Sequence, residues 1–495
     1  MKKIEHLKFN NTYARLPDIF FSHVKPTPLR NTHLISANLA MAEILGIDPD
    51  ELHQPAALEF LSGQTLLQDM QPIAQCYAGH QFGSFVPRLG DGRAILLGEI
   101  ETPLHGKWDL QIKGGGPTPY SRDGDGRAVL RSTIREYLCS EAMHGLGIPT
   151  TRALCMLGSD EEVYREQIEK GALLLRTAPS HVRFGSFEYF YYSNRHEDLG
   201  DLLHYVLEQH FPAFIETDNP ALSLLKEVIQ RTARLMAQWQ SVGFAHGVMN
   251  TDNMSILGLT MDYGPFGFLD AYQPGYVCNH SDYQGRYAFD QQPNIGLFNL
   301  SCLAQALLPT LDENPETAVA YAKSALETYQ PLYVAQYAKL MRSKLGFTTE
   351  HADDQTILQD LLSLMADDHV DYTLLFRQLS RFSTDTADNN APIRNLFIQR
   401  ERFDLWVQNY RQRLLAEPEN DQQRIKTLLQ TNPKYILRNY MAEIAIQRAE
   451  TEQDYTEINR MLKLLGKPYD EHPDQEHYAG FPPEWAQQIS VSCSS

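Results

Sequence analysis

The segment HGVMNTDNMSILGLTMDYG, residues 246–264, carries side chains well suited to holding a metal ion. Asn253 offers an amide oxygen, and Asp262 offers a carboxylate nine residues later. Mg²⁺ and Mn²⁺ prefer such hard oxygen donors where they bridge the phosphates of a nucleotide. The pattern therefore indicates phosphate-transfer chemistry, although an Asx-rich turn followed by a chance Asp-Tyr-Gly would give the same letters.

The spacing inside this segment is that of a protein-kinase catalytic loop, in which an Asn follows a His by seven residues and an Asp-Phe-Gly comes later. His246 and Asn253 keep that interval, and Asp262 begins an Asp-Tyr-Gly. Val248, however, stands where a kinase keeps its catalytic aspartate. Phosphoryl transfer relies mostly on positioning and electrostatics, so losing that base need not abolish chemistry. Asp252, one residue before Asn253, is the carboxylate to take its place.

A lysine and a glutamate form a second candidate pair. The alternating run DLQIK ends in Lys113, and Glu136 follows 23 residues later in a helical pattern. In kinases a strand lysine held by a helix glutamate presents its charge to the nucleotide phosphates. Taken alone, these two residues more often represent a surface lysine and an unrelated solvated glutamate.

Glycine-rich loops and arginines suggest an anion site. Arg93 and Arg127 each follow a Gly-Asp-Gly, and glycine lets backbone N–H groups approach an anion closely. Arg176 ends a strand-like run and Arg183 follows seven residues later, so two guanidiniums can fork onto phosphate oxygens. The simpler alternatives are that the glycine-rich loops are turns between strands and that the arginines form surface salt bridges. Together with Lys113, and in so acidic a chain, the arginines are easier to understand as a built anion site.

Net charge, apolar runs and cysteine spacing limit the partners, the cellular location and the metal sites that we expect. Of 495 residues, 43 are Lys or Arg and 62 are Asp or Glu, a net charge of -19 that repels nucleic acid and anionic membranes. We expect neither as a partner. The start MKKIEHLKF has no apolar run of signal-peptide type, and no window reaches 18 apolar residues, so we expect a cytoplasmic protein. The six cysteines lie far apart without a C-x-x-C pair, and we expect no structural zinc site.

Hydrophobic periodicity predicts four regions. Residues 1–75 form an N-terminal extension with a helix over 31–47, and residues 76–190 a small sheet, with strands near 93–100, 107–113 and 172–178 and one helix over 128–147. Residues 191–385 are mainly helical, beginning with a helix over 221–242 that Gly243 ends. Residues 386–495 form a C-terminal helical extension that ends near Cys493.

Long blocks of the chain resemble the selenoprotein O family of kinase-like proteins. They are YAGHQFGSFVPRLGDGRA, WDLQIKGGGPTPYSRDGDGRAVLRSTIREYL, RTAPSHVRFGSFEYF, HGVMNTDNMSILGLTMDYGPFGFLD and NPKYILRNYMAEIAIQ. The resemblance implies an α+β fold, a bilobed protein-kinase-like fold with N-terminal and C-terminal helical extensions. Cys493, third from the end, resembles the cysteine version found in bacterial members.

The activity implied by the resemblance is protein adenylylation, or AMPylation. AMP moves from ATP to Ser, Thr or Tyr hydroxyls of protein substrates, with the nucleotide reversed relative to a kinase and Mg²⁺ or Mn²⁺ as cofactor. For some bacterial members it also implies Mn²⁺-dependent UMP transfer from UTP, and for the family a role in redox or stress response. A kinase-like phosphotransferase using Asp252 and a non-catalytic nucleotide-binding pseudokinase are the alternatives.

Individual roles follow from the matching blocks. The resemblance implies that Asp252 is the proton acceptor, that Asn253 and Asp262 bind the metal, and that Glu136 holds Lys113. It implies nucleotide contacts from Gly90, Gly92, Arg93, Lys113, Asp125, Gly126, Arg176, Arg183 and Asp262.

The chemistry of these side chains agrees better with AMP transfer than with phosphorylation. Attack at the α-phosphorus expels pyrophosphate, and two extra arginines would stabilise the charge that develops on that leaving group. A further hypothesis concerns redox control. Cys493 on a terminal tail could pair with Cys278, which lies 16 residues after Asp262 in the segment that matches a kinase activation loop. Such a bridge would tie down that segment and alter access to the site. Two independent thiols fit the sequence equally well.

Overall fold

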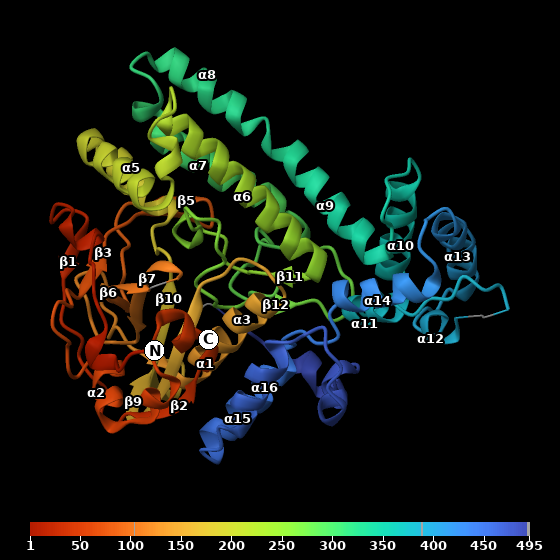
Figure 1. Ribbon diagram of the computed structural model, residues 1–495, viewed down its shortest axis with the longest axis horizontal. Coiled ribbons are helices and arrows are strands. Elements are labelled where there is room, and N and C mark those ends of the chain that lie inside the picture. The colour runs from red at the N-terminus through yellow and green to blue at the C-terminus, as the bar shows by residue number, and fades with distance from the viewer. Residues whose placement is uncertain (103, 388–389, 493–495) are drawn as a thin grey trace.

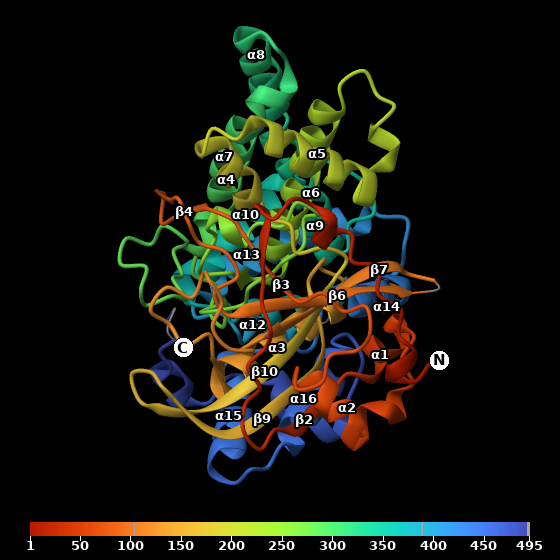
Figure 2. The ribbon, with the colours of Figure 1, turned by 90° about the vertical axis from the view of Figure 1, so that its left-hand side faces the viewer.

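The computed structural model describes residues 1–102, 104–387 and 390–492. One antiparallel sheet dominates the first 180 residues, with strand order β1-β3-β6-β7-β10-β9-β2 and β8 paired to β10 (Figures 1 and 2). The strands are β1 (Phe21–His23), β2 (His33–Ala37), β3 (Ile73–Gln75), β6 (Ala94–Thr102), β7 (Gly106–Lys113), β8 (Ala128–Val129), β9 (Arg152–Tyr164) and β10 (Ile168–Ala178). A separate hairpin pairs β4 (Gly79–Gln81) with β5 (Ser84–Val86).

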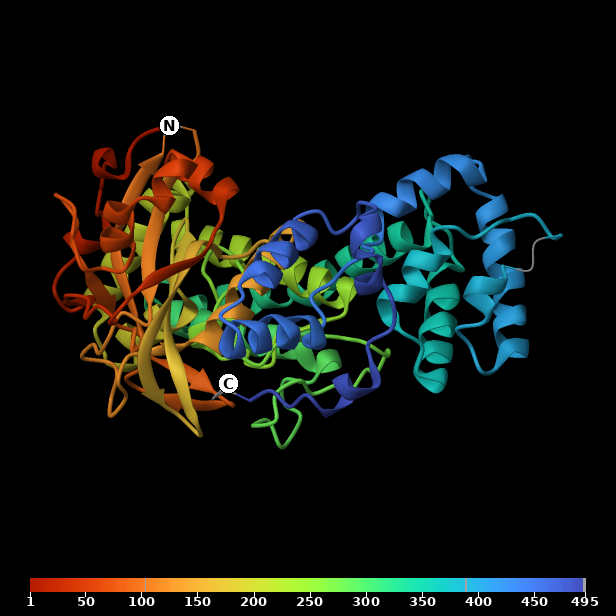
Figure 3. The same cartoon turned by 90° about the horizontal axis from the view of Figure 1, so that it is seen from below.

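Helix α3 (Leu130–Gly145) crosses the sheet against β9 and β10. Its other side packs against α15 (Asn439–Thr451) and α16 (Thr456–Leu465), so the end of the chain returns to the sheet region (Figures 1 and 3). Tyr137 and Leu138 of α3 share one buried core with Ala442 of α15 and Met461 of α16. Burial on both sides fixes the position of this helix and of the polar residues that it carries.

Two groups of helices follow the sheet. The first comprises α4 (Phe184–Tyr192), α5 (His196–His210), α6 (Pro220–Val242), α7 (Gln292–Leu311), α8 (Pro315–Leu326) and α9 (Tyr329–Leu345). The second comprises α10 (Asp354–Asp368), α11 (Tyr372–Leu379), α12 (Ala391–Arg394), α13 (Arg400–Leu415) and α14 (Asp421–Thr431), and lies farthest from the sheet (Figure 3). The small pair β11 (Phe244–Ala245) and β12 (Gly267–Phe268) flanks the segment that contains the predicted metal ligands.

Local signals set the ends of the longest helix, α6. The Asn219 side chain accepts a hydrogen bond from the backbone N–H of Leu222 (2.9 Å), and Pro220 takes the first helical position. Gly243 ends the helix in the left-handed region with φ of +72°, as predicted. Helix α7, with the turn before it, is long and apolar enough to span a membrane (Phe289–Leu311), but it packs against α4, α6 and α8.

The α+β class is confirmed, whereas the helix predicted over 31–47 is wrong in its first half. Residues His33–Ala37 form β2 at the sheet edge, paired with β9, a strand that was not predicted. The Asn38 side chain accepts from the N–H of Met41 (3.2 Å) and starts the shorter α1 (Leu39–Leu45). The residues predicted as one helix therefore form a strand followed by a capped helix. Helix α2 (Pro55–Leu61) follows in the chain.

Candidate active site

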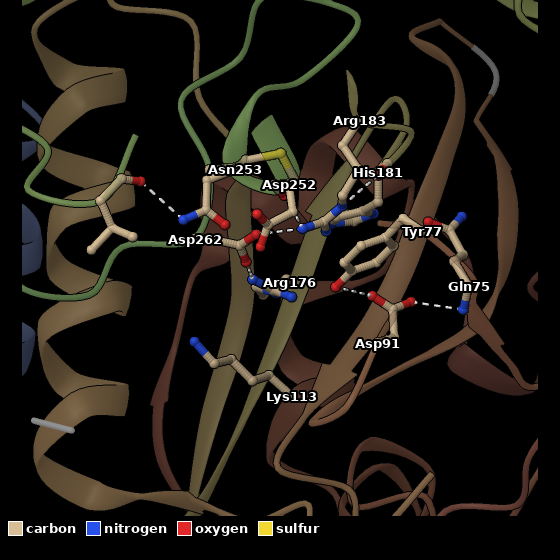
Figure 4. Close-up of polar contacts among 12 residues, drawn as sticks. Gln75, Tyr77, Asp91, Lys113, Arg176, His181, Arg183, Asp252, Asn253 and Asp262 are labelled. Carbon is tan, nitrogen blue, oxygen red and sulfur yellow. Dashed lines mark hydrogen bonds and ion pairs between the residues drawn. The ribbon is translucent and has the colours of Figure 1, made fainter. Parts of the chain in front are cut away.

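A cavity of about 610 Å³ opens between the sheet and the segment 248–265 (Figure 4). The predicted metal, nucleotide and base residues all line it: Gly90, Gly92, Arg93, Lys113, Asp125, Gly126, Arg176, Arg183, Asp252, Asn253 and Asp262. They come from β7, β10, the N-cap of α4, two glycine-rich loops and the segment after β11, so the fold gathers residues that lie up to 172 positions apart.

Asp262 is held by two buried arginines. Arg176 Nη1 lies 2.5 Å from one carboxylate oxygen and Arg183 Nη1 lies 2.7 Å from the other. Burial alone would raise the pKa of Asp262, but the charges of Arg183, Arg176 and Lys113 hold it well below its usual range. Its backbone lies in the left-handed region with φ of +57°, a strained conformation for a non-glycine residue. Asp262 is therefore an ionised carboxylate kept in a costly conformation.

The register of the sheet explains why the cations meet. Arg176 of β10 stands opposite Gln111 of β7, and Lys113 follows two residues later on the same face. Arg176 Nη2 donates to Gln111 Oε1 (2.6 Å) and its Nη1 to Glu136 Oε1 (3.1 Å). Glu136, on α3, accepts from Lys113 Nζ with its second oxygen. The predicted lysine and glutamate thus form an ion pair, and the glutamate also holds an arginine.

Both arginines keep a buried nitrogen that has no hydrogen-bond partner among the described residues: Arg176 Nε and Arg183 Nη2. The side chains themselves are 4% and 2% exposed. Buried guanidinium N–H groups normally find acceptors, because an unmade bond there costs about 1–3 kcal/mol. Both arginines also line the cavity, and two guanidinium charges in its wall suit an anionic ligand.

Asp252 lies in a short 3₁₀ turn, Thr251–Asn253. One of its carboxylate oxygens accepts from Gln81 Nε2 (3.0 Å), whereas the other, Oδ1, is buried without a hydrogen-bond partner in the described chain. Burial raises its pKa to about 6, against the lowering effects of Gln81 and Arg183. A carboxylate with this pKa in the wall of a cavity is suited to accept a proton near neutral pH.

Asn253 is oriented for a cation. Its amide nitrogen donates to the carbonyl of Val248 (3.0 Å), so the valine contributes its backbone to the site, and the amide oxygen is turned toward Asp262 (Figure 4). One carboxylate and one amide oxygen form a donor set that fits Mg²⁺ or Mn²⁺. His246 is buried, with Nε2 2.9 Å from the carbonyl of Met261, and supports the loop without reaching the cavity.

The glycine-rich loops need their glycines for close approach. Gly90 has φ of +86°, and a Cβ there would lie 2.4 Å from the Tyr120 ring; at Gly126, with φ of +68°, it would lie 2.0 Å from the carbonyl oxygen of Gly116. Arg93 is exposed on the cavity wall. The other arginine that follows a Gly-Asp-Gly, Arg127, is different. Its guanidinium turns away to the Thr27 carbonyl and to Glu161 (3.0 Å).

Comparison with known proteins adds to this geometry. The family model described as protein adenylyltransferase SelO matches residues 3–465. The chain belongs to the SelO family. It is 53% identical to the protein nucleotidyltransferase YdiU of Myxococcus xanthus and 52% identical to that of Thioalkalivibrio sulfidiphilus, each over the full length of both chains. As a member of the SelO family, the chain is a nucleotidyltransferase.

Several cavity residues of this SelO-family chain were not predicted. Asp91 is buried between the two predicted glycines, and accepts from the Gln75 N–H (3.0 Å) and the Tyr77 hydroxyl (3.3 Å). Arg183 stacks over the Tyr77 ring at 4.4 Å, and Arg165 pairs with Asp125 at 2.9 Å. Asp91 stands inside the GDGR motif that drew attention to its neighbours, whereas Arg165 lies in a stretch with no motif at all.

Of the two cysteines of the redox hypothesis, the structure describes Cys278, which does not line the cavity. Cys278 is buried, with its thiol 3.6 Å from the Ala245 carbonyl. Cys493 falls outside the described residues. The tail reaches this region of the fold, because the N–H of His280 donates to the carbonyl of Val491 (3.0 Å). Their pairing stays a prediction.

Proposed function

We propose that this chain transfers AMP from ATP to Ser, Thr or Tyr hydroxyl groups of protein substrates. One observation carries the proposal: two buried arginines with spare N–H groups converge with Lys113 and Asp262 at a cavity that also contains Asp252. Family membership supports a nucleotide as the donated group. The positive charges of the two arginines and Lys113 indicate that the polyphosphate of this nucleotide binds deepest in the cavity.

The proposed step is an in-line displacement at the α-phosphorus. The substrate hydroxyl oxygen forms a bond to this phosphorus, the bond from phosphorus to the bridging oxygen of the β-phosphate breaks, and pyrophosphate leaves. Asp252, in the cavity wall, takes the hydroxyl proton on its carboxylate. Negative charge grows on pyrophosphate, so Arg176, Arg183 and Lys113 stabilise the transition state more than the ground state.

Asn253 and Asp262 would hold Mg²⁺ or Mn²⁺. When bound, such an ion would supply positive charge that neutralises the phosphates. Arg176 and Arg183 orient the Asp262 carboxylate, and the Val248 carbonyl orients the Asn253 amide. UTP as a second donor remains a prediction.

A bilobed, kinase-like arrangement is the finer fold proposal. The sheet with α3 would be the smaller lobe, near 76–190, and the helices after it the larger lobe, near 191–385. The cavity then lies between the lobes, with Lys113 and Glu136 on one side and Asn253 on the other. Residues 1–75 and 386–495 would be the extensions, although β1, β2 and β3 of the first extension join the main sheet.

The test uses ATP labelled either at the α-phosphorus or at the γ-phosphorus, incubated with the purified chain and a protein extract. AMP transfer puts the α label on protein and leaves the γ label in pyrophosphate. Label from the γ position alone would replace the proposal with a kinase-like phosphotransferase that uses Asp252.

The third possibility is a non-catalytic pseudokinase, which Val248 favours. It predicts that neither label reaches protein while ATP still binds. The Asp252 carboxylate in the cavity wall, with its pKa raised to about 6, is a feature that binding alone does not require. Measuring ATP binding in the same preparation separates this outcome from an inactive sample.

A further inference from the structure

A second cluster of ligand atoms lies behind the catalytic loop, outside the cavity. His80 of β4, Glu188 of α4 and Cys302 of α7 bring a ring nitrogen, a carboxylate oxygen and a sulfur within 4.8 Å of one another. His80 Nδ1 lies 2.5 Å from Glu188 Oε1. We propose that these three side chains form a binding site for a soft divalent metal ion of the Zn²⁺ class, separate from the hard Mg²⁺ or Mn²⁺ site.

The donor types and distances suit zinc. Thiolate, imidazole and carboxylate are its usual ligands, at about 2.0–2.3 Å, which in a tetrahedron places the donor atoms about 3.3–3.8 Å apart. The His80 and Glu188 atoms would need to separate by about 1 Å, and the remaining pairs to close by at most about 1.5 Å. Side-chain rotation covers such changes. The fourth position is left for water or another oxygen donor.

The surroundings of the Glu188 carboxylate suit a cation. Its side chain is fully buried, and within the described residues no lysine or arginine forms an ion pair with it. Its partners are the imidazole of His80 and the hydroxyl of Thr251. A buried carboxylate without a permanent positive partner is costly, and a divalent ion would neutralise it together with the Cys302 thiolate.

Binding requires a proton to leave Cys302. Burial and the nearby Glu188 raise the pKa of this thiol to about 12, so the ion must displace the proton as the Zn–S bond forms. Of the two paired ligands, His80 is the one nearer the surface, with its side chain 13% exposed. The absence of a C-x-x-C pair in the sequence excluded only local zinc motifs, whereas these ligands stand 108 and 114 positions apart.

The site is connected to the transferase loop. Glu188 can ligate through Oε1 and still accept from the Thr251 hydroxyl through Oε2. The backbone N–H of His80 also donates to that hydroxyl (2.6 Å). The next residue of β4, Gln81, donates a hydrogen bond from its side chain to the Asp252 carboxylate. An ion here would therefore fasten β4 and α7 to the loop that carries the proposed base.

Cobalt substitution tests the site independently of nucleotide transfer. Co²⁺ bound to a thiolate gives a near-ultraviolet charge-transfer band that oxygen ligands at Asn253 and Asp262 do not produce. We expect the full chain to bind one Co²⁺ with this band, Zn²⁺ to abolish it, and excess Mg²⁺ to leave it unchanged. Zn²⁺ should also raise the thermal midpoint of the wild-type chain.

Matched cysteine variants complete the design. Cys302→Ser should lose the band and the Zn²⁺-dependent thermal shift, whereas Cys155→Ser, at a buried cysteine in the sheet core, should keep both. Glu188→Gln provides a second test if Cys302→Ser folds poorly. A wild-type chain without the band, or a folded Cys302→Ser variant that retains it, would overturn the proposal.

Discussion

Two buried clusters of arginine and carboxylate use the same chemistry to opposite ends. In the distal helices, all three guanidinium nitrogens of Arg413 are used: they bind Asp354 (2.6 Å), Glu417 (2.6 Å) and the Thr349 carbonyl (2.7 Å). At the cavity, Arg176 and Arg183 each keep a buried nitrogen without a partner among the described residues.

The two clusters also differ in the number of cations relative to carboxylates. One arginine shares two carboxylates in the distal cluster, whereas Arg176, Arg183 and Lys113 share only Asp262 and Glu136 in their ion pairs. The closed distal cluster has more carboxylates than cations, whereas the open cavity cluster has more cations than carboxylates, which suits an anionic ligand. The excess of cations over carboxylates, more than an unpartnered nitrogen as such, distinguishes the cavity, because the buried Nε of Arg424 in α14 also has no partner among the described residues.

The sharpest test of this difference exchanges one carboxylate in each cluster for an amide. Asp262→Asn should lower the rate of nucleotide transfer by at least about 10³-fold, because the proposed metal loses its anionic ligand and both arginines lose their partner. The matched Asp354→Asn should leave the rate per folded molecule unchanged and lower the free energy of unfolding by about 1–3 kcal/mol. Rates and urea unfolding curves measured on both variants decide it. Equal loss of activity in the two would erase the distinction.

The proposed base gives the next largest effect. Asp252→Asn should lower kcat by about 10²–10³-fold while ATP binding stays near the wild-type value, because the carboxylate acts on the proton of the incoming hydroxyl. Single-turnover transfer and equilibrium ATP binding measure the two quantities. A comparable loss of ATP affinity would show that Asp252 contributes to nucleotide binding instead.

Arginine geometry is tested by a conservative exchange. Arg183→Lys keeps the charge but loses the planar fork, and we expect kcat/KM for ATP to fall by about 10²-fold. Arg413→Lys, the matched change in the closed cluster, should destabilise the chain with normal kinetics. Steady-state kinetics on both variants provides the comparison, and unchanged kinetics in Arg183→Lys would mean that its spare N–H does not meet the nucleotide.

The smallest effect is a contrast in how two carboxylates titrate. Burial raises the pKa of Asp109, in the wall behind the cavity, to about 7, so its contribution to stability declines as pH rises from about 4 to 7. The hydrogen bonds to Glu417 outweigh its burial and lower its pKa to about 2, so its contribution is lost as pH falls from about 4 to 2. Urea unfolding at several pH values should show Asp109→Asn removing the first dependence only. A wild-type-like dependence between pH 4 and 7 in that variant would contradict the assignment.

The site was more predictable than the fold around it. Lys113, Asn253 and Asp262 stand in motifs whose spacing carries their chemistry, and the cavity contains all three. Asp91 could have been found, since it lies between two predicted glycines. Arg165 could not, because its place depends on the long β9–β10 hairpin bringing it to Asp125.

The error over residues 31–47 has a physical cause. Leu34, Leu39, Met41 and Leu45 satisfy a helical period when read together, but β2 ends at Ala37 and the helix begins only after Asn38 caps it. Edge pairing with β9 decides the first half, and such long-range pairing leaves no local signal. The His80, Glu188 and Cys302 cluster was likewise invisible, because three distant elements create it.

The most direct test of the central claim is the mass added to a substrate peptide. The transfer reaction is run with ATP, and a modified Ser, Thr or Tyr peptide is sequenced by mass spectrometry, with Asp262→Asn as the inactive control. An added AMP group, absent from the control, is the predicted result. An added phosphate on the same hydroxyl would contradict the claim that the open arginine cluster binds pyrophosphate as the leaving group.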